Sequence, residues 1–155
     1  MSSSFLPHEG SRIALAIATV VLLSACCFAA LGGGESSIVA DQTHMKAQRR
    51  VVQNSGYSVH EMQDANGIMV REFVSPGGKV FGVSWQGPVR PDLQQVLGSY
   101  YDQFMRSAPT RRTHGPVNIS VPGLVVQTGG HARALMGHAY IPEMVPNGMN
   151  PGDIR

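Results

Sequence analysis

Three ionisable side chains near the middle of the chain have the types needed for acid–base chemistry. His60 is followed directly by Glu61, and Glu72 comes later in the same region. An imidazole oriented by a carboxylate is an arrangement that general-base catalysis uses, so a hydrolase based on a His60/Glu72 pair is one hypothesis. The sequence places no serine or cysteine nucleophile with this pair. A cross-strand ion pair at a sheet edge is therefore the simpler interpretation, and we lean towards a protein that is not an enzyme.

Two further histidines and a pair of glycines give no support for a metal or a cofactor. His131 and His138 are seven residues apart on one expected strand, and an odd spacing directs side chains to opposite faces of a sheet. The stretch Gly129-Gly130-His131 lacks the lysine and the following helix of a phosphate-binding loop, so it predicts a hairpin turn. We expect no metal site and no cofactor.

Aromatic residues offer a candidate ligand site. Trp85, Tyr100 and Tyr101 could line an apolar pocket between a helix and a sheet, although plain core packing is the simpler interpretation. The partner expected on this basis is a small apolar ligand or an unidentified envelope protein.

Charge and composition exclude some classes. The chain has 155 residues and a net charge of +2, and its only adjacent basic pairs are Arg49-Arg50 and Arg111-Arg112. A nucleic-acid surface needs a denser basic stripe, so we expect no nucleic-acid binding. The loop with Arg111-Arg112 and His114 could contact lipid headgroups or an acidic partner, but a solvated loop is the simpler interpretation.

The first 29 residues predict a signal sequence. Ile13 to Ala25 is an unbroken apolar run of the length of a signal-peptide core, followed by small residues. Cleavage before Ala30 would release a periplasmic or secreted protein. Leu23-Ser24-Ala25-Cys26 also matches a lipobox, in which Cys26 is acylated and anchors a lipoprotein to the membrane. An uncleaved anchor spanning Ile13 to Leu31 is a third alternative.

The remaining sequence predicts a single α+β domain with a mostly antiparallel sheet of about six strands, in the order α-βββ-α-βββ. An amphipathic helix beginning at Pro91-Asp92 packs across the sheet, with apolar residues at helical spacing from Leu93 to Phe104. The expected regions are a signal sequence (1–29), a flexible spacer (30–35), the domain (36–141) and an irregular tail (142–155). The other expected elements are a helix over 36–48 and strands over 57–63, 68–74, 79–86, 117–121, 124–128 and 131–140.

The first hairpin allows its register to be predicted. A two-residue loop at Asn66-Gly67 would place Glu61 opposite Glu72, and facing like charges are destabilising. A three-residue loop, 65–67, instead places Glu61 opposite Arg71 and His60 opposite Glu72, and we favour it. In the next strand Phe81, Val83 and Trp85 alternate, which predicts that they share the core face beside Glu72, Val70 and Ile68.

Several segments together resemble a known family. They are SSIVAD, YSVHE, VREFVSPGGKVF, SWQGP, PDLQQVLGSYY, GLVVQTGGHARALMGHAYIP and the closing DIR. The chain resembles, over about residues 31–155, the exported proteobacterial proteins grouped as domain-of-unknown-function family 2844. The resemblance implies export and one domain, and it supplies no catalytic residues. It also favours cleavage before Ala30, whereas Cys26 departs from the family pattern. The function expected is that of an exported, non-enzymatic binding or assembly module.

Overall fold

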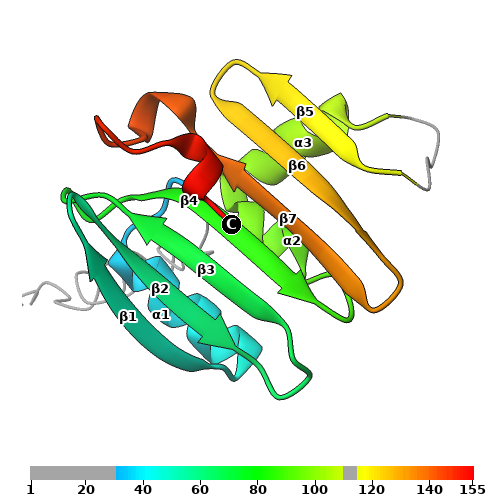
Figure 1. The fold of residues 1–155 in the computed structure, drawn as a ribbon, viewed down its shortest axis with the longest axis horizontal. Coiled ribbons are helices and arrows are strands. Elements are labelled where there is room, and N and C mark those ends of the chain that lie inside the picture. Colours follow the sequence, from blue (N-terminus) through cyan, green and yellow to red (C-terminus); the bar gives the residue numbers. More distant parts are fainter. Residues whose placement is uncertain (1–30, 110–114) are drawn as a thin grey trace, which may run out of the picture.

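The computed structural model describes residues 31–109 and 115–155, and within them seven strands form one antiparallel sheet (Figure 1). Their order across the sheet is β1-β2-β3-β4-β7-β6-β5. The strands are β1 (Gln48–Asn54), β2 (Tyr57–Gln63), β3 (Met69–Val74), β4 (Val80–Gly87), β5 (Val117–Val121), β6 (Leu124–His131) and β7 (Ala134–Tyr140). The α+β class with a mostly antiparallel sheet is confirmed, and the strand count is slightly higher than predicted.

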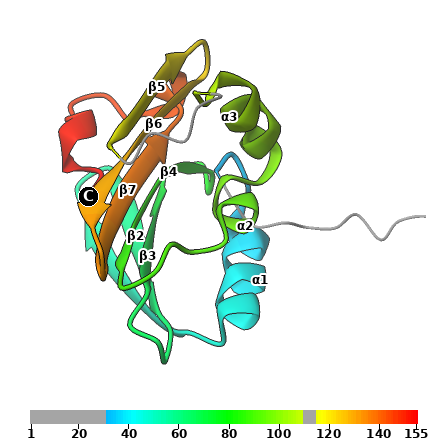
Figure 2. The same cartoon turned by 90° about the vertical axis from the view of Figure 1, so that its right-hand side faces the viewer.

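The helices cover one face of the sheet, and the C-terminal segment lies against the other (Figure 2). The helices are α1 (Glu35–Met45), α2 (Leu93–Leu97) and α3 (Tyr101–Ser107), with a 3₁₀ turn, η1 (Gly98–Tyr100), between the last two. Two further 3₁₀ turns, η2 (Pro142–Met144) and η3 (Pro151–Asp153), belong to the C-terminal segment. We call the two sides of the sheet the helix face and the open face.

Each face has its own apolar cluster. The cluster on the helix face includes Val70, Val83, Trp85, Leu97, Leu124 and Val126. The cluster on the open face is smaller and consists of Val59, Phe73, Phe81 and Ile154. Ile154 is fully buried and would contact a Cβ at Gly82, so the expected irregular tail, 142–155, also packs on the sheet.

The helix predicted from Leu93 to Phe104 is broken in two. It begins as expected, because the Asp92 side chain accepts hydrogen bonds from the backbone N–H groups of Gln94 and Gln95. It then stops at Gly98, whose φ of 49° is in the region that favours glycine. Apolar periodicity continued across the break because α2 and α3 pack on the same core, so periodicity alone could not reveal it.

The first hairpin has the register that the charge argument predicted. Glu61 pairs with Arg71, and His60 pairs with Glu72. The backbone N–H of Asp64 donates to Ile68 O at 3.0 Å, which leaves residues 65–67 as the loop. Avoidance of two facing carboxylates therefore sufficed to select this register.

The prediction that Phe81, Val83 and Trp85 share one face is wrong, because β4 carries a bulge. The pairs Val74–Val80 and Phe73–Gly82 leave Phe81 as an extra residue in β4. Phe81 consequently packs on the open face, while Val83 and Trp85 pack under the helices. Val83 lies opposite Glu72, two residues away from the expected register. One residue of this shift comes from the bulge and the other from the turn, whose loop is residues 76–78 because Ser75 N–H donates to Lys79 O at 2.9 Å.

Three further expectations need correction. Strand β1 was not predicted, because its polar, largely exposed sequence QRRVVQN at the sheet edge has no apolar alternation. The turn of the last hairpin lies at Ala132-Arg133, not at Gly129-Gly130, because β6 continues to His131, which pairs with Ala134. Part of the expected flexible spacer is anchored, since Gly32 N–H donates to Val80 O at 2.8 Å and Gly33 O accepts from Val80 N–H at 3.0 Å.

Candidate functional site

A continuous row of polar residues crosses the open face. Strand pairing places one residue of each strand side by side in this polar row, from β1 to β5: Arg50, Glu61, Arg71, Ser84, His138, Gln127 and Asn118. Side chains alternate between the faces of a strand, so all seven lie on the same side of the sheet. The polar row runs across the whole sheet, from one edge strand to the other, as is common on the solvated face of an antiparallel sheet.

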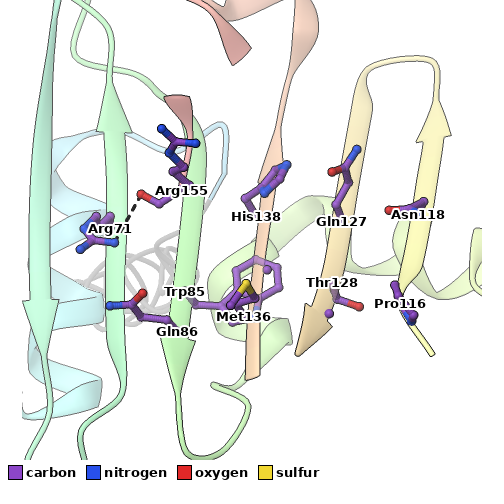
Figure 3. A pocket seen from close by; sticks show the side chains of 12 residues that line it. Arg71, Trp85, Gln86, Pro116, Asn118, Gln127, Thr128, Met136, His138 and Arg155 are labelled. Carbon is purple, nitrogen blue, oxygen red and sulfur yellow. Dashed lines mark hydrogen bonds between the residues drawn. The ribbon is translucent and has the colours of Figure 1, made fainter. Parts of the chain in front are cut away.

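A groove of about 310 Å³ lies over the central and β5 side of this row (Figure 3). Its walls and floor come from five strands, β3 to β5 through β4, β7 and β6. The lining residues are Arg71, Trp85, Gln86, Pro116, Asn118, Gln127, Thr128, Gly129, Met136, Gly137, His138 and Arg155. Because neighbouring strands are about 4.8 Å apart, four spacings give the groove a length of about 19 Å. Its volume is near the lower limit for ligand pockets, so it is long and narrow.

Arginines form one end of the groove. Arg71 Nε donates to Glu61 Oε1 at 3.0 Å, and Arg71 Nη1 donates to the Arg155 carbonyl oxygen at 3.3 Å. These two bonds hold the Arg71 guanidinium in place, and Figure 3 shows Arg155 above it. The C-terminal segment thereby closes this end of the groove.

Amide side chains form the opposite end. Asn118 and Gln127 are directly paired across β5 and β6, and both are exposed. No side-chain hydrogen bond of either amide is found in residues 31–109 and 115–155. A primary amide carries two donors and an acceptor, so these groups are available to a ligand.

His138 lines the centre of the groove, and its neighbour in the polar row, Ser84, lies buried beneath it. Burial lowers the pKa of His138, which keeps its imidazole neutral at pH 7, and the ring stacks on Tyr140 with centroids 6.3 Å apart. Ser84 pairs with both Arg71 and His138, and its buried hydroxyl has no hydrogen-bond partner among the described residues. A buried unpaired hydroxyl costs free energy, so Ser84 is a polar group kept beneath the groove without a structural partner.

The candidate pair His60 and Glu72 lies on the helix face, away from the groove. Their Cα atoms are paired across β2 and β3, yet both side chains are buried, with 6% and 0% exposed. The one ion pair found among the described residues joins Arg71 to Glu61, so His60 and Glu72 do not form a salt bridge. Ser58 Oγ lies 3.5 Å from His60 Nε2, whereas His60 Nδ1 has no partner in the described chain.

Glu72 instead lies beside a second carboxyl group, that of Asp41 on α1. Burial raises the pKa of Glu72 well above its ordinary value, and the Asp41 carboxyl raises it further. Burial also raises the pKa of Asp41, which accepts a hydrogen bond from Gln95 Nε2. Two buried carboxyl groups side by side favour a protonated Glu72, whose two carboxyl oxygens have no hydrogen-bond partner among the described residues.

The aromatic candidates do not come together in one pocket. Trp85 borders the groove, whereas Tyr100 and Tyr101 are half-buried against the helix-face core. His131 is exposed at the end of β6, and His138 is on β7, so the two histidines are not on one strand as expected. Cys26, Arg111, Arg112 and His114 lie outside the described residues.

Sequence reasoning missed the groove residues other than Trp85. The sequence offers Arg71 only as a cross-strand partner and His138 only as a rejected metal ligand, and no local pattern singles out Gln86, Asn118 or Gln127. The available signal was the polar partner in each strand's alternation, in VNISV for example, where Asn118 and Ser120 flank a buried Ile119. Only the pairing of β4 with β7 places these positions in one row.

The fold and the site define a small antiparallel-sheet protein with a groove on the open face of its sheet. The chain belongs to the family described as protein of unknown function DUF2844, whose family model matches residues 27–154. No curated protein and no solved structure matches it.

Two negative findings concern the described residues. None of their helices is long and apolar enough to cross a membrane. They contain no group of three or more His, Cys, Asp or Glu side chains suited to holding a metal ion.

Proposed function

We propose that this protein is an exported, non-enzymatic binding module whose ligand lies in the groove across the open face. The observation that carries the proposal is the groove itself, because four residues of the polar row, Arg71, His138, Gln127 and Asn118, line it from four different strands. Ligand sites are concave, and a few polar groups orient what they bind.

The ligand fits a polar, elongated class better than the small apolar one expected from the aromatic residues. The groove is about 19 Å long by the strand spacing, and arginine, histidine and amide side chains line it. Met136 and Pro116 add apolar surface between these polar groups, and the nearly buried Trp85 borders the groove from the helix-face side of Gly137. Such a lining suits a chain molecule with polar groups at regular intervals.

A groove-blocking variant tests this proposal. At Gly129 the nearest atom to an added Cβ is Pro116 Cβ at 4.0 Å, so Gly129→Leu would fill the groove without a clash at Cβ. Gly77→Leu, in the exposed turn between β3 and β4, is the matched control. Saccharide and peptide arrays would be probed with the wild type and both variants. We expect ligands that bind the wild type and Gly77→Leu but not Gly129→Leu; no binding, or binding that Gly129→Leu retains, would contradict the proposal.

Export is the second part of the proposal, and the leader sequence supports it. If Cys26 is acylated, only residues 27–30 separate the lipid from Leu31, which is buried in the domain. The intact mass of the mature protein, with and without an inhibitor of lipoprotein signal peptidase, distinguishes the alternatives. A lipid-free species beginning at Ala30 means release, and an acylated species beginning at Cys26 means membrane anchoring. A full-length cytoplasmic protein would contradict export.

The hydrolase hypothesis has less support. Its two residues are buried on the helix face and form no ion pair with each other, and general-base catalysis needs a base within hydrogen-bond reach of the substrate. His60→Ala would abolish activity if the hypothesis held, so a panel of ester and glycoside substrates with this variant decides it.

A further inference from the structure

We infer that the groove binds a linear oligosaccharide, with its hydroxyl groups recognised by the amides of Asn118 and Gln127 and by His138. This inference rests on the proposed function and adds the chemical class of the ligand.

The first argument concerns how the groove crosses the sheet. It runs across the faces of five strands, where the backbone N–H and C=O groups are used in the strand ladders. A peptide that binds by strand addition needs the free backbone groups of a sheet edge. Recognition in this groove therefore depends on side chains, and a peptide backbone gains none of its usual partners here.

The second argument concerns the side chains themselves. A sugar hydroxyl both donates and accepts hydrogen bonds, and so does a primary amide, whereas carboxylates and ammonium groups do only one. Asn118 and Gln127 are adjacent, exposed and without side-chain hydrogen bonds in the described chain. His138, the next residue of the row, has one donor and one acceptor nitrogen when neutral, and its lowered pKa favours that form.

The third argument concerns the unpaired groups and the length. The Ser84 hydroxyl, between Arg71 and His138, has no partner but is buried beneath the groove, so the ligand contacts in this part of the row come from its two neighbours. Arg71, fixed by Glu61 and the Arg155 carbonyl, offers its remaining donors in a defined orientation. Hydrogen-bonding groups thus recur from strand to strand along about 19 Å, which a monosaccharide would leave largely unfilled.

The test is a titration of the full mature protein with linear hexasaccharides, followed by calorimetry and by the fluorescence of Trp85. Trp85 is the only tryptophan of the chain and borders the groove, so its emission reports on this site. The probes are cellohexaose, maltohexaose, chitohexaose and hexagalacturonate, and an acidic heptapeptide is the comparison. The double variant Asn118→Ala/Gln127→Ala removes the amide pair, and Gln94→Ala, an exposed glutamine on α2, is its control.

We expect at least one hexasaccharide to bind and to change the Trp85 emission. The double variant should weaken that binding about tenfold or more, because two hydrogen bonds are lost, and Gln94→Ala should leave it unchanged. If hexagalacturonate binds more tightly than the neutral hexasaccharides, its carboxylates contact Arg71 and Arg155. If the neutral hexasaccharides bind equally well, the amides of Asn118 and Gln127 provide the main contacts.

Failure of this inference differs from failure of the proposed function. If no hexasaccharide binds but a peptide does, and Gly129→Leu abolishes that binding, the groove is the site and the saccharide inference is wrong. If a hexasaccharide binds but neither Gly129→Leu nor the double variant weakens it, the site lies elsewhere and both proposals are wrong.

Discussion

The two faces of the sheet place a glutamate in opposite environments, one partly solvated and one buried. Glu61 on the open face has a side chain 28% exposed and is paired with Arg71, whereas Glu72 on the helix face is fully buried beside Asp41. Apart from His60 and Glu72, the middle row of the helix face is apolar and consists of Val51, Val83, Ala139, Val126 and Ile119. The row on the other side is polar throughout.

This difference shows where stability and function are separated in the molecule. The helix face holds most of the buried apolar side chains, so its polar groups are constrained by packing and desolvation. The open face is covered by the C-terminal segment over only part of its area, so its polar groups remain near solvent and available to a ligand. Substitutions that are matched across the two faces measure this separation.

The largest expected effect comes from truncation in the two apolar clusters. Leu97→Ala on the helix face removes a fully buried side chain and should lower the free energy of unfolding by about 2–5 kcal/mol. Ile154→Ala on the open face should cost less, because the C-terminal segment can detach locally while the sheet stays folded. Urea denaturation gives the two costs, and amide exchange should accelerate in residues 142–155 for Ile154→Ala alone. Equal costs with global loss of protection would show that the segment is part of the main core.

The next effect concerns the buried carboxyl pair. Because the pKa of Glu72 is raised in the folded protein, folding retains a proton that the unfolded chain loses above its ordinary value of 4.5. Stability should therefore fall as the pH rises from 4.5 through the folded pKa of Glu72. Glu72→Gln should remove this alkaline loss and stabilise the protein at pH 9 by on the order of 1–3 kcal/mol, since it removes a buried charge.

The matched control for the carboxyl pair is Glu61→Gln, which should change the stability at pH 9 by less than about 1 kcal/mol.

His60 acts in the opposite direction, because its pKa is lowered, chiefly by burial, and stability is lost as the pH falls below 6.5. Thermal denaturation between pH 4 and pH 9 measures both effects: the loss of stability at high pH and the loss of stability at low pH. If the stability of Glu72→Gln still fell with rising pH as it does in the wild type, Glu72 would not be the cause of that fall.

Gly137→Ala tests the close approach of Trp85 to β7. A Cβ at Gly137 would lie 2.4 Å from Trp85 Cζ2 and 2.9 Å from the backbone oxygen of Gln127, so the indole and the neighbouring strand must shift, at a cost of about 1–3 kcal/mol. Gly129→Ala on the adjacent strand, where nothing lies nearer than 4.0 Å, should cost less than about 0.5 kcal/mol. Urea denaturation and the Trp85 emission spectrum provide the readouts. Unaltered emission and stability in Gly137→Ala would contradict this packing.

The smallest effect is expected for the ion pair on the open face. Arg71→Gln should lower the stability by about 0.2–1 kcal/mol, less at high salt, because both side chains are partly solvated. A double-mutant cycle with Glu61→Gln isolates the pair. A coupling free energy well above 1 kcal/mol would indicate that the open face contributes to stability as the helix face does.

Local patterns predicted much of the fold. Alternation and turn residues located six of the strands, Asp92 located the start of α2, and the repulsion of like charges selected the first hairpin register. Prediction failed where the apolar pattern was absent or did not change at a boundary. Strand β1 has no apolar alternation, and the helical spacing of apolar residues continues past Gly98, where the helix is interrupted. Phe81 appeared to alternate with Val83 because a bulge leaves no mark in the hydrophobic pattern.

The candidate site was beyond the reach of these patterns. The sequence by itself determined the α+β class, the hairpins and the polar or apolar character of each strand position, because these follow from neighbouring residues. Only the tertiary structure decided that β4 pairs with β7, which brings Ser84 next to His138 and aligns one polar residue from each strand. That pairing joins segments about fifty residues apart, and it depends on burying both halves of the sheet under common helices, a free energy that no local stretch of sequence contains.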